Sequence, residues 1–541
     1  MGRDLLTRKR DAKLWRSNGA ASTLAESIIF NLIGKLFSIS PFYPTNVCYF
    51  TSMNHRSLGC VLSLVVSLWA APLHADEASE SNCRRFYDQV DRTISQAGVG
   101  DAQETAMKGY PYLRSNRFLT SAVKDADNDE RFDFLLQQLM ALDQRARRLE
   151  LSNLPPLALA DLERAQREIF PSQNEIPATL DACAKTLVAV DRSRPDAIKH
   201  KVRTPDSYSL FKRLLGFYPI TAIPFSRGIR KFQAEMTQIY EKNLSEVVRD
   251  SGVVFHVPRS SEAIDVAALL RNASDNLLQI PLPSSDQLAQ LFARFAPNFA
   301  VDTRGKFDLP GAVRWSDGAR PNIDPSSTKI YTLASHTRFE GQTLLQLNYV
   351  IWFGERPKTG RFDMLGGALD GLIWRVTLAP DGEPLVYDTI HPCGCYHLFF
   401  PTDRLRAKPP HPSLQEHAYV PQAAPRLGPG ERPTVWVASG SHYIVRLTNT
   451  TPGAPRTAIP YELADYDQLR SLPQADGTRR SLFRPNGLIG DTERGERLFF
   501  WPMGIASAGA MRQWGHHATA FVGMRHFDDA DLIEKVFEPA N

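Results

Sequence analysis

The stretch that decides the fold is Leu345-Gln346-Leu347-Asn348-Tyr349-Val350-Ile351-Trp352-Phe353. Its apolar side chains alternate with other residues, which is the period of a β-strand, where successive side chains point to opposite faces. Trp352 falls on the face opposite Ile351 and Phe353, so we expect this strand to be buried on both sides. The stretch therefore predicts a strand inside a sheet.

Two hairpins are predicted on the C-terminal side of this strand. Residues 372–378 and 385–390 flank Ala379-Pro380-Asp381-Gly382, a turn in which Gly382 supplies the positive φ angle. Residues 435–438 and 443–447 flank Ser439-Gly440-Ser441-His442 in the same way. Between the hairpins, residues 401–433 hold eight prolines and are predicted to be a long irregular loop. A helix is expected at about 529–537.

The sequence before residue 245 has helical patterning instead. Phe132, Leu135, Leu136 and Leu139 form an apolar stripe at spacings of three and four, and Asn128 or Asp127 is the expected N-cap. Further helices are predicted from Pro155-Pro156 to Pro171, at 178–190 and at 227–243, and residues 218–225, with two prolines, as a hinge-like connection. The predicted fold class is α+β, with a helical domain at 76–250 and a larger β-rich, mostly antiparallel domain at 251–541.

The charge of the chain excludes one class of partner. The formal net charge is +4, but residues 1–75 hold eight basic and three acidic residues, and residues 76–541 hold 55 basic and 56 acidic residues. A nucleic-acid-binding surface needs clustered Lys and Arg to neutralise phosphates. We therefore expect no nucleic-acid partner, and instead an envelope ligand or a small molecule.

Residues 53–75 resemble a secretory signal peptide. Arg56 supplies the basic head, an apolar run follows, and small residues lead to Ala75. We expect translation to start at Met53, with residues 1–52 being an upstream extension introduced by an error of gene prediction, and the mature protein to be periplasmic or secreted. Alternatively, residues 57–73 stay as a membrane anchor, and this uncleaved N-terminal segment is then the only expected contact with the membrane.

The cysteines fit an exported protein. After the predicted signal peptide the chain has four, Cys83, Cys183, Cys393 and Cys395. Cys83 and Cys183 are the expected disulfide, since disulfides form and persist in oxidising compartments. Two buried free thiols are the alternative for this pair.

The densest group of chemically versatile side chains is His391-Pro392-Cys393-Gly394-Cys395-Tyr396-His397. His391, Cys393, Cys395 and His397 are four candidate metal ligands, with zinc the expected ion if one is bound. In an extended strand the two histidines would lie about 20 Å apart. One ion can therefore hold all four only if Pro392 and Gly394 bend the segment, or if ligands come from elsewhere; His336, Asp388 and His442 are candidates.

Two other interpretations of this segment remain open. Cys393 and Cys395 can form a strained, easily reduced disulfide with a redox function. Alternatively, the segment is a structural bend at the end of a strand, and the two histidines are satisfied by ordinary hydrogen bonds. The sequence alone does not separate these interpretations from the metal site.

Weaker catalytic candidates lie elsewhere in the second half. If residues 336–340 are helical, His336 and Glu340 share one face and can act as an acid–base pair; an exposed pair at a strand entry is the alternative. Asp388 is a further candidate because it lies three residues before His391. Asp363 and Asp370 flank Gly366-Gly367, which indicates a turn or, alternatively, a pair of catalytic carboxylates.

Common catalytic motifs are missing from the sequence. It has no phosphate-binding Gly-x-x-x-x-Gly-Lys-Ser/Thr, no His-Glu-x-x-His and no Gly-x-Ser-x-Gly. The leading hypothesis is an exported cell-envelope protein with a binding or structural function. The alternatives are a metal-dependent hydrolase centred on residues 391–397 and a thiol-disulfide protein that uses Cys393 and Cys395.

Overall fold

The computed structural model describes residues 71–247, 252–257, 264–316, 320–409, 415–428, 430–449 and 457–540, with side chains from residue 79 onward. The described residues belong to one compact unit. The predicted extension at 1–52 and residues 53–70 of the predicted signal peptide lie outside them. Within the described residues, no helix is both long and apolar enough to cross a membrane.

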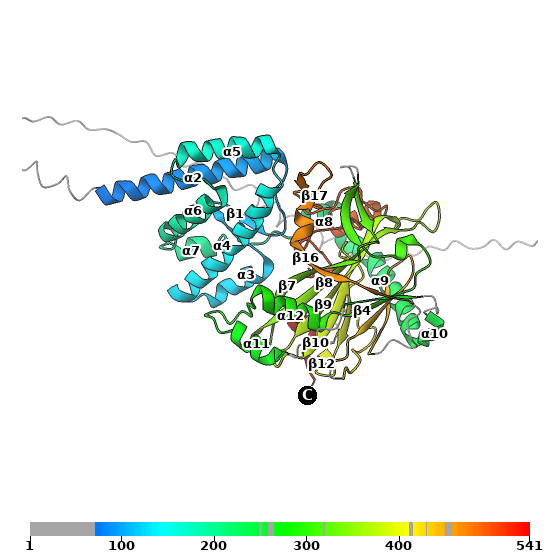
Figure 1. The fold of residues 1–541 in the computed structure, drawn as a ribbon. Coiled ribbons are helices and arrows are strands. Elements are labelled where there is room, and N and C mark those ends of the chain that lie inside the picture. Colours follow the sequence, from blue (N-terminus) through cyan, green and yellow to red (C-terminus); the bar gives the residue numbers. More distant parts are fainter. Residues whose placement is uncertain are drawn as a thin grey trace, which may run out of the picture. The chain divides into compact units, whose positions relative to one another are not determined.

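A six-stranded sheet occupies the centre of the C-terminal half (Figure 1). Its strands follow the order β11 (Leu398–Pro401), β10 (Pro384–Ile390), β9 (Gly367–Leu378), β8 (Gln342–Arg356), β7 (Lys329–Phe339) and β16 (Glu462–Asp465). All neighbours are antiparallel except β16, which runs parallel to β7. Tyr349 of β8 lies between Thr332 of β7 and Trp374 of β9. The predicted strand is confirmed, and Trp352 and Phe353 are both fully buried.

A second sheet packs against the first. It has the order β14 (Ile444–Thr448), β13 (Thr434–Val437), β4 (Asn298–Val301), β3 (Val253–His256) and β15 (Thr457–Pro460). Two of its pairs, β4 with β13 and β3 with β15, are parallel. Phe299 and Val435 of this sheet share one core with Tyr349 and Trp374 of the first. Both predicted hairpins, β9 with β10 and β13 with β14, are confirmed as antiparallel pairs.

Short elements complete this half of the chain. The remaining strand pairs are β5 (Ala312–Ser316) with β6 (Arg320–Asp324), β12 (Leu405–Ala407) with β19 (Phe537–Pro539), and β17 (Leu472–Pro473) with β18 (Arg479–Arg480). The helices are α11 (Val266–Ala273), α12 (Ser285–Phe295), η2 (Lys306–Asp308), α13 (Asp467–Arg470), α14 (Arg497–Phe500), η3 (Trp501–Met503) and α15 (Leu532–Val536). The predicted loop at 401–433 thus contains β12, and the predicted C-terminal helix is shorter than expected.

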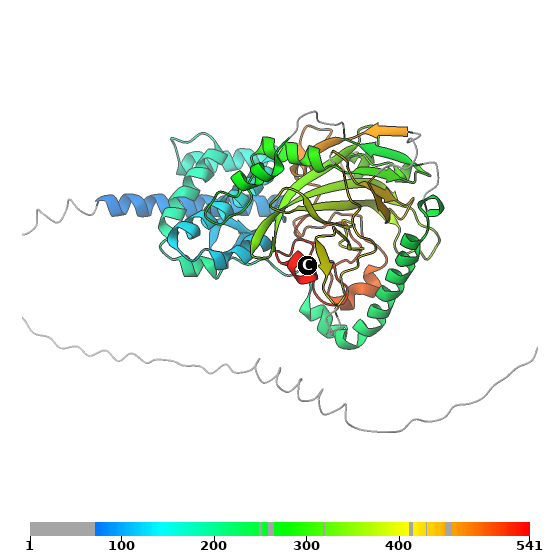
Figure 2. The ribbon, with the colours of Figure 1, turned by 90° about the horizontal axis from the view of Figure 1, so that it is seen from below.

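The predicted hinge at 218–225 is wrong, because these residues begin a long helix. Helix α8 (Leu210–Leu215) is followed by α9 (Tyr218–Glu241) and α10 (Leu244–Val247). Figure 2 shows α9 as the long green helix at the lower right. Pro219 lies in the first turn, where a helix needs no backbone donor, whereas Pro224 removes one hydrogen bond inside it. The C-terminal half of α9 packs Met236 and Tyr240 into the core between the sheets.

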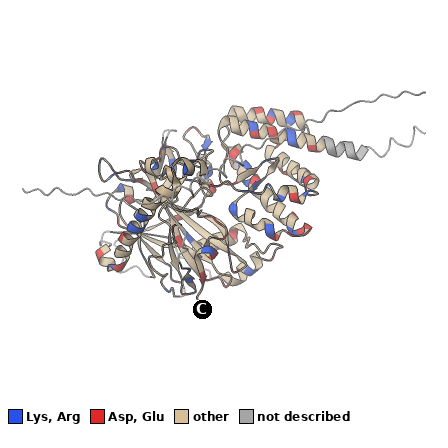
Figure 3. Cartoon of the chain, turned by 180° about the vertical axis from the view of Figure 1, so that it is seen from behind, with Lys and Arg blue, Asp and Glu red and all other residues tan. Residues whose placement is uncertain are grey.

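Charged side chains of both signs are mixed over the helices and the strands (Figure 3). Many of them are paired. Arg470 of α13 is buried and forms ion pairs with Asp101 (2.6 Å) and Glu104 (2.9 Å), which precede β1 in the helical part. Arg145 of the helical part pairs with Asp467 of α13. The helical residues and the sheet residues are therefore joined by buried charges.

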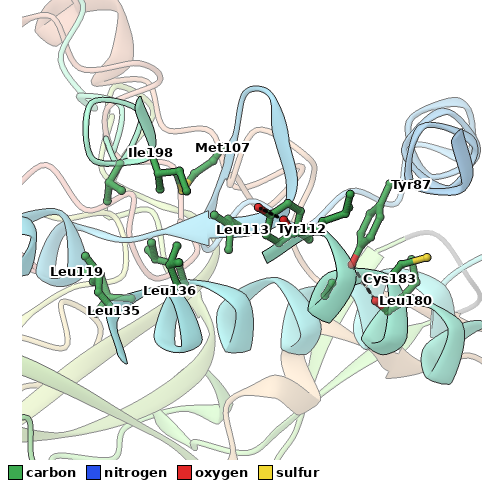
Figure 4. Close-up of a cluster of buried hydrophobic side chains, with 14 of the residues drawn as sticks. Tyr87, Met107, Tyr112, Leu113, Leu119, Leu135, Leu136, Leu180, Cys183 and Ile198 are labelled. Carbon is green, nitrogen blue, oxygen red and sulfur yellow. Dashed lines mark hydrogen bonds between the residues drawn. The ribbon is translucent and has the colours of Figure 1, made fainter. Parts of the chain in front are cut away.

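The helical part has its own hydrophobic core. It consists of α2 (Ala71–Ala97), α3 (Arg117–Ala122), η1 (Val123–Asp125), α4 (Asp129–Ser152), α5 (Pro156–Ile169), α6 (Ile176–Asp191) and α7 (Pro195–Lys199). Asn128 caps α4 as predicted, and its side chain accepts a hydrogen bond from the backbone N–H of Arg131. Leu135 and Leu136 of the predicted stripe are buried, and the Tyr87 hydroxyl donates to the Leu180 carbonyl (Figure 4).

The predicted disulfide between Cys83 and Cys183 is confirmed. It joins α2 to α6, and the Cα atoms of the two cysteines lie 5.1 Å apart. Both residues belong to the core of the helical part. The bridge therefore fixes the first described helix to a helix 100 residues later.

A hairpin inside the helical part was not predicted. Strands β1 (Thr105–Met107) and β2 (Tyr110–Ser115) form an antiparallel pair, with Gly109 at φ 92° in the turn. Arg114 of β2 is buried and pairs with Asp143 (3.0 Å) and Glu150 (2.8 Å) of α4. These ion pairs depend on contacts distant in sequence, which is why local patterning did not indicate the hairpin.

Candidate functional site

The segment that carries the four predicted ligands is a tight bend between β10 and β11. The His391 N–H donates to the Cys395 carbonyl (3.0 Å), and the Gly394 N–H donates to the His391 carbonyl (2.8 Å). Gly394 has a φ of 89°, and a Cβ atom there would overlap the Ala518 carbonyl. Tyr396 also has a positive φ, 60°. The segment is therefore bent, as Pro392 and Gly394 allow, and not extended.

The bend does not bring the predicted ligands to one point. Within the described part of the chain, no group of three or more His, Cys, Asp and Glu side chains is placed to hold a metal ion. His391 and His397 each face a different carboxylate, Asp370 and Asp388. The metal site remains a prediction from sequence.

Cys393 and Cys395 are buried, unbridged thiols. The hydrogen bond with Cys393, together with burial, raises the pKa of the Cys395 thiol well above its ordinary value. Cys395 therefore stays protonated at neutral pH, and it is the thiolate that acts as nucleophile or metal ligand. The redox function of the two cysteines remains a prediction from sequence.

His391 belongs to a buried relay of four side chains. Its Nδ1 atom lies 3.3 Å from Oδ1 of Asp370, and Oδ2 of Asp370 lies 2.8 Å from Nδ1 of His442. The other ring nitrogen of His442 lies 3.4 Å from Asp308, which accepts hydrogen bonds from the Ser439 hydroxyl and the Gly440 N–H. Three of these four residues were named from sequence; Asp308 was not.

The charges along the relay alternate. Burial opposes ionisation of Asp370, but the two imidazoles outweigh it and hold the pKa of Asp370 well below its ordinary value. Burial lowers the pKa of His442, and its bonds to Asp308 and Asp370 more than compensate, so this pKa is raised. For His391, burial prevails over the attraction of Asp370 and lowers the pKa. The two carboxylates thus favour the protonated form of His442, whereas burial favours the neutral form of His391.

The second predicted histidine lies in a separate buried group. Asp388 receives two hydrogen bonds from the Arg375 guanidinium and lies 2.9 Å from Nε2 of His397. Arg375 also lies over the Phe527 ring, 3.7 Å from its centroid. Burial lowers the pKa of His397 to about 4, so the ring is neutral near pH 7. Asp388, a predicted catalytic candidate, thus has its charge compensated by Arg375.

An apolar cavity of about 450 Å³ lies beside the bend. It is formed by α9, by residues 395–398 and by residues near α14 and 519–521. The apolar lining includes Pro224, Phe225, Ile229, Phe232, Tyr396, Leu398, Phe500 and Phe521. His397, Glu416, Glu496 and Thr519 supply polar groups. A mostly apolar cavity with a few converging polar groups is the usual form of a small-molecule site.

The lining of this cavity has two carboxyl groups whose pKa burial raises, Glu416 and Glu496, and Glu496 is the one with a value near neutral pH. Burial raises its pKa to about 7, against the attraction of Arg356, Arg494 and Arg512. Glu416, the other acidic residue in the lining, already accepts a hydrogen bond from the Phe521 N–H and lies 3.7 Å from Arg525. Glu496 therefore exchanges a proton near neutral pH, which is what an acid–base or head-group-binding residue requires.

Two tyrosines connect the cavity with the relay. The rings of Tyr396 and Tyr443 lie 4.5 Å apart, and the His391 ring lies 5.0 Å from Tyr396 and 5.7 Å from Tyr443. The Arg356 guanidinium donates to the Tyr443 hydroxyl at 3.1 Å. Nε2 of His391 has no hydrogen-bond partner among the described residues. The tyrosine pair therefore lies between a neutral buried imidazole and the cavity.

The other candidates have structural surroundings. His336 lies in strand β7, so the predicted helical pairing with Glu340 is wrong; Glu340 lies in the exposed turn after the strand. Nε2 of His336 bonds the Pro281 carbonyl, and burial lowers its pKa to about 4. Asp363 accepts hydrogen bonds from Thr359 and from the Leu365 N–H within its own turn, which is the structural role that the sequence offered as one interpretation.

Comparison of the chain with protein-family models, with curated proteins and with solved structures found no match.

Glu496 and Arg356 were missed by the sequence reasoning. Both lie in stretches without a recognisable motif, and Glu496 is separated from Tyr396 by 100 residues of sequence. No local signal marked Glu496, which follows two other acidic residues, Asp491 and Glu493, in a charged stretch. Gly509, at φ 83°, contacts Glu496 so closely that a Cβ atom would overlap the carboxylate.

Proposed function

We propose that the protein is an exported envelope protein that binds a small amphipathic anion. The apolar body of the ligand occupies the cavity between α9 and the bend, and its acidic head group lies at Glu496. The observation that carries the proposal is the combination of an apolar cavity of about 450 Å³ with a carboxyl group whose pKa is about 7.

The charges around Glu496 select the sign of the head group. Arg356, Arg494 and Arg512 act on Glu496 electrostatically, against the single opposing carboxylate of Asp370. The three arginines are not among the residues that line the cavity, so they attract an anionic head group at Glu496 through space, and a protonated Glu496 can donate a hydrogen bond to it. A carboxylate or phosphate head group fits such surroundings, and a cationic one is repelled.

The contacts of the described residues favour a binding function over a metal-dependent hydrolase and over a thiol-disulfide protein. Metal-dependent hydrolysis and thiol–disulfide exchange both remain predictions from sequence. His391 and His397 each use one ring nitrogen on a buried carboxylate, Asp370 and Asp388, and these two carboxylates belong to separate groups. Export remains a prediction as well, supported by the confirmed disulfide, since such bridges form and persist in oxidising compartments.

The test uses a fluorescent fatty acid as the probe. Gly228 lines the cavity, and a Cβ atom at this position meets no atom within 4 Å. Gly228→Trp is therefore expected to fill the cavity and to weaken probe binding at least tenfold, whereas Gly228→Ala retains it. Ala160→Trp, on the exposed side of α5, is the control for an added indole. Equal binding by Gly228→Trp and the wild type would contradict the proposal.

Glu496→Gln tests the head-group position. In the wild type, probe affinity is expected to rise as the pH falls through about 7, because protonation of Glu496 removes a negative charge next to the head group. In Glu496→Gln this dependence should disappear, with the affinity fixed near the acidic limit. Glu340→Gln, in an exposed turn, is the matched control. An unchanged pH profile in Glu496→Gln would place the head group elsewhere.

A further inference from the structure

One face of the molecule exposes large apolar side chains. They come from α8, from the first turns of α9 and from α14 with η3. We call this set the apolar platform: Leu210, Phe211, Leu214, Leu215, Phe217, Ile220, Ile223, Leu498, Phe499 and Trp501. It holds more than half of the exposed large apolar side chains of the described residues. Patches of this kind mark interaction surfaces.

The two parts of the platform are held together by polar contacts beneath it. The Ser209 N–H donates to the Gly504 carbonyl (2.9 Å), and Nε of Arg213 donates to the Met503 carbonyl (2.9 Å). The Arg213 guanidinium also lies over the rings of Tyr208 and Tyr218, at 4.7 and 4.3 Å. Figure 2 shows the orange-red helix α14 beside the green helices at the lower edge. The exposed residues thus belong to a well-packed surface.

Exposure on the platform is high. Leu214 is 71% exposed, Phe211 68% and Phe217 70%. Phe211 and Leu214 lie in α8, the helix that Arg213 anchors on its inner side, and Phe217 is the N-cap residue of α9. A single exposed apolar side chain is ordinary on a protein surface, whereas a group of this size is characteristic of an interaction surface.

The charges around the platform point to the nature of that medium. No acidic residue occurs between Asp206 and Glu235, a stretch that contains Lys212, Arg213, Arg227, Arg230 and Lys231. Arg227 and Arg230 are exposed, and Lys231 pairs with Glu235 at 3.8 Å. Arg497, next to Leu498, is exposed as well. Exposed Asp491 and Glu493 precede α14, so the stretch without acids is the one that contains α8 and the first turns of α9. Apolar side chains combined with such a cation-rich stretch are typical of segments that lie in the interface of an anionic membrane.

Exposed apolar residues also adjoin the lining of the apolar cavity in sequence. Pro224, Phe500 and Leu365 line the cavity, and their sequence neighbours Ile223, Phe499 and Met364 are exposed. Phe362, in the turn before Leu365, is 90% exposed. Two of the segments that carry the platform, the start of α9 and α14, therefore also contribute residues to the cavity lining.

We propose that the apolar platform docks on the surface of an anionic phospholipid bilayer. The apolar side chains enter the interface between head groups and acyl chains, while Arg227, Arg230 and Arg497 contact lipid phosphates. A second copy of this chain is a poorer occupant, because platform-to-platform packing brings two sets of cations together. Docking stands on the platform alone; the entry of the ligand from the bilayer into the cavity rests on the proposed function.

The first experiment is flotation of the full chain with vesicles. Binding is expected to phosphatidylcholine vesicles that contain phosphatidylglycerol, to weaken with added salt, and to fall at least tenfold in Phe211→Glu/Leu214→Glu. Leu157→Glu, on the 82% exposed Leu157 of α5, is the matched control and should bind as the wild type does. All variants share residues 1–75, so any contribution of the N-terminal segment is the same in each.

A second readout is specific to the platform. Trp501 is 41% exposed, and its fluorescence should be quenched by lipids brominated near the head-group end of the acyl chain. Trp501→Phe should remove this quenched component. Equal flotation of Phe211→Glu/Leu214→Glu and the wild type, or a Trp501 signal unaffected by brominated lipid, would overturn the proposal.

Two further outcomes are distinguishable. If the platform covers a second copy, light scattering without vesicles shows a dimer that Phe211→Glu/Leu214→Glu converts to a monomer, and the membrane proposal is overturned. Fatty-acid binding without vesicles should be unchanged in Phe211→Glu/Leu214→Glu. Loss of vesicle binding with intact fatty-acid binding supports docking, whereas failure of Gly228→Trp to block the probe affects only the proposed function.

Discussion

Nδ1 of His442 lies 2.8 Å from Oδ2 of Asp370, and both side chains are buried. The His442 ring also stacks on Phe353, with 4.0 Å between ring centroids and an interplanar angle of 2°. His442 lies in the turn before β14, and Asp370 lies in strand β9. This hydrogen bond therefore connects the two sheets. A buried ion pair with an aromatic neighbour leaves little freedom for either residue.

Asp370→Asn should be strongly destabilising. It leaves the His442 cation with Asp308 alone and removes the acceptor of His391, and breaking a buried ion pair typically costs about 3–5 kcal/mol. Urea unfolding monitored by tryptophan fluorescence measures the loss. Glu340→Gln, in an exposed turn, should leave the midpoint unchanged. A loss below about 1 kcal/mol for Asp370→Asn would show that the pair is weakly coupled to folding.

His336 should make the protein less stable in acid. Its folded pKa is about 4, below the ordinary value of 6.5, so the unfolded chain takes up a proton first and stability falls as the pH drops from about 6.5 to 4. His336→Gln can keep a donor to the Pro281 carbonyl and should remove up to about 3 kcal/mol of this acid-induced loss. The slope of unfolding free energy against pH is the measurement; an identical slope would contradict the prediction.

Substitutions of Phe217 distinguish the effect of backbone strain on stability from the effect of the side chain on membrane binding. The φ of Phe217 is 49°, a left-handed conformation that is costly for a side chain with a Cβ atom. Phe217→Gly relieves this strain and should raise the free energy of unfolding by roughly 0.5–1 kcal/mol after the entropy of glycine is subtracted. Phe217→Ala keeps the strain and should show no such gain. Both variants should bind anionic vesicles more weakly than the wild type.

The disulfide should be a large contributor to stability. Cross-linking residues 100 apart restricts the unfolded chain by about 4–5 kcal/mol in the chain-entropy model. Cys83→Ala/Cys183→Ala should therefore unfold at much lower urea concentration, and dithiothreitol should lower the wild type to a similar midpoint. If dithiothreitol shifts the double variant as well, another bridge is present.

The fold class could be predicted because its signals are local. Alternation over 345–353, the turn at Asp381-Gly382 and the stripe around Leu135 depend only on neighbouring residues. The failures have two causes, long-range contact and ambiguous local composition. The β1–β2 hairpin depends on ion pairs with α4, and the start of α9 was taken for a hinge because prolines in a first turn and a hinge have the same composition.

The candidate site was predicted only in part, again because of long-range contact. The bend at 391–397 was located from the density of its His and Cys residues, but their roles were decided by Asp370, Asp388 and Arg375 from other strands. Glu496 acquires its pKa from burial, which no local pattern encodes. The exposed apolar residues of α8 are unremarkable in sequence, and only their position outside the core makes them informative.

Arg470 has a further consequence for how this chain can vary. Its side chain is fully buried and contacts Asp101, Glu104 and Asp467, while the Asn153 amide donates to its carbonyl at 2.8 Å. The helical part and the sheet-containing part have separate hydrophobic cores, but Asp101 and Glu104 of the first form buried ion pairs with Arg470 of the second. A recombinant that exchanged only one of the two parts would separate Asp101 and Glu104 from Arg470. The two parts are therefore expected to be inherited together as a single unit.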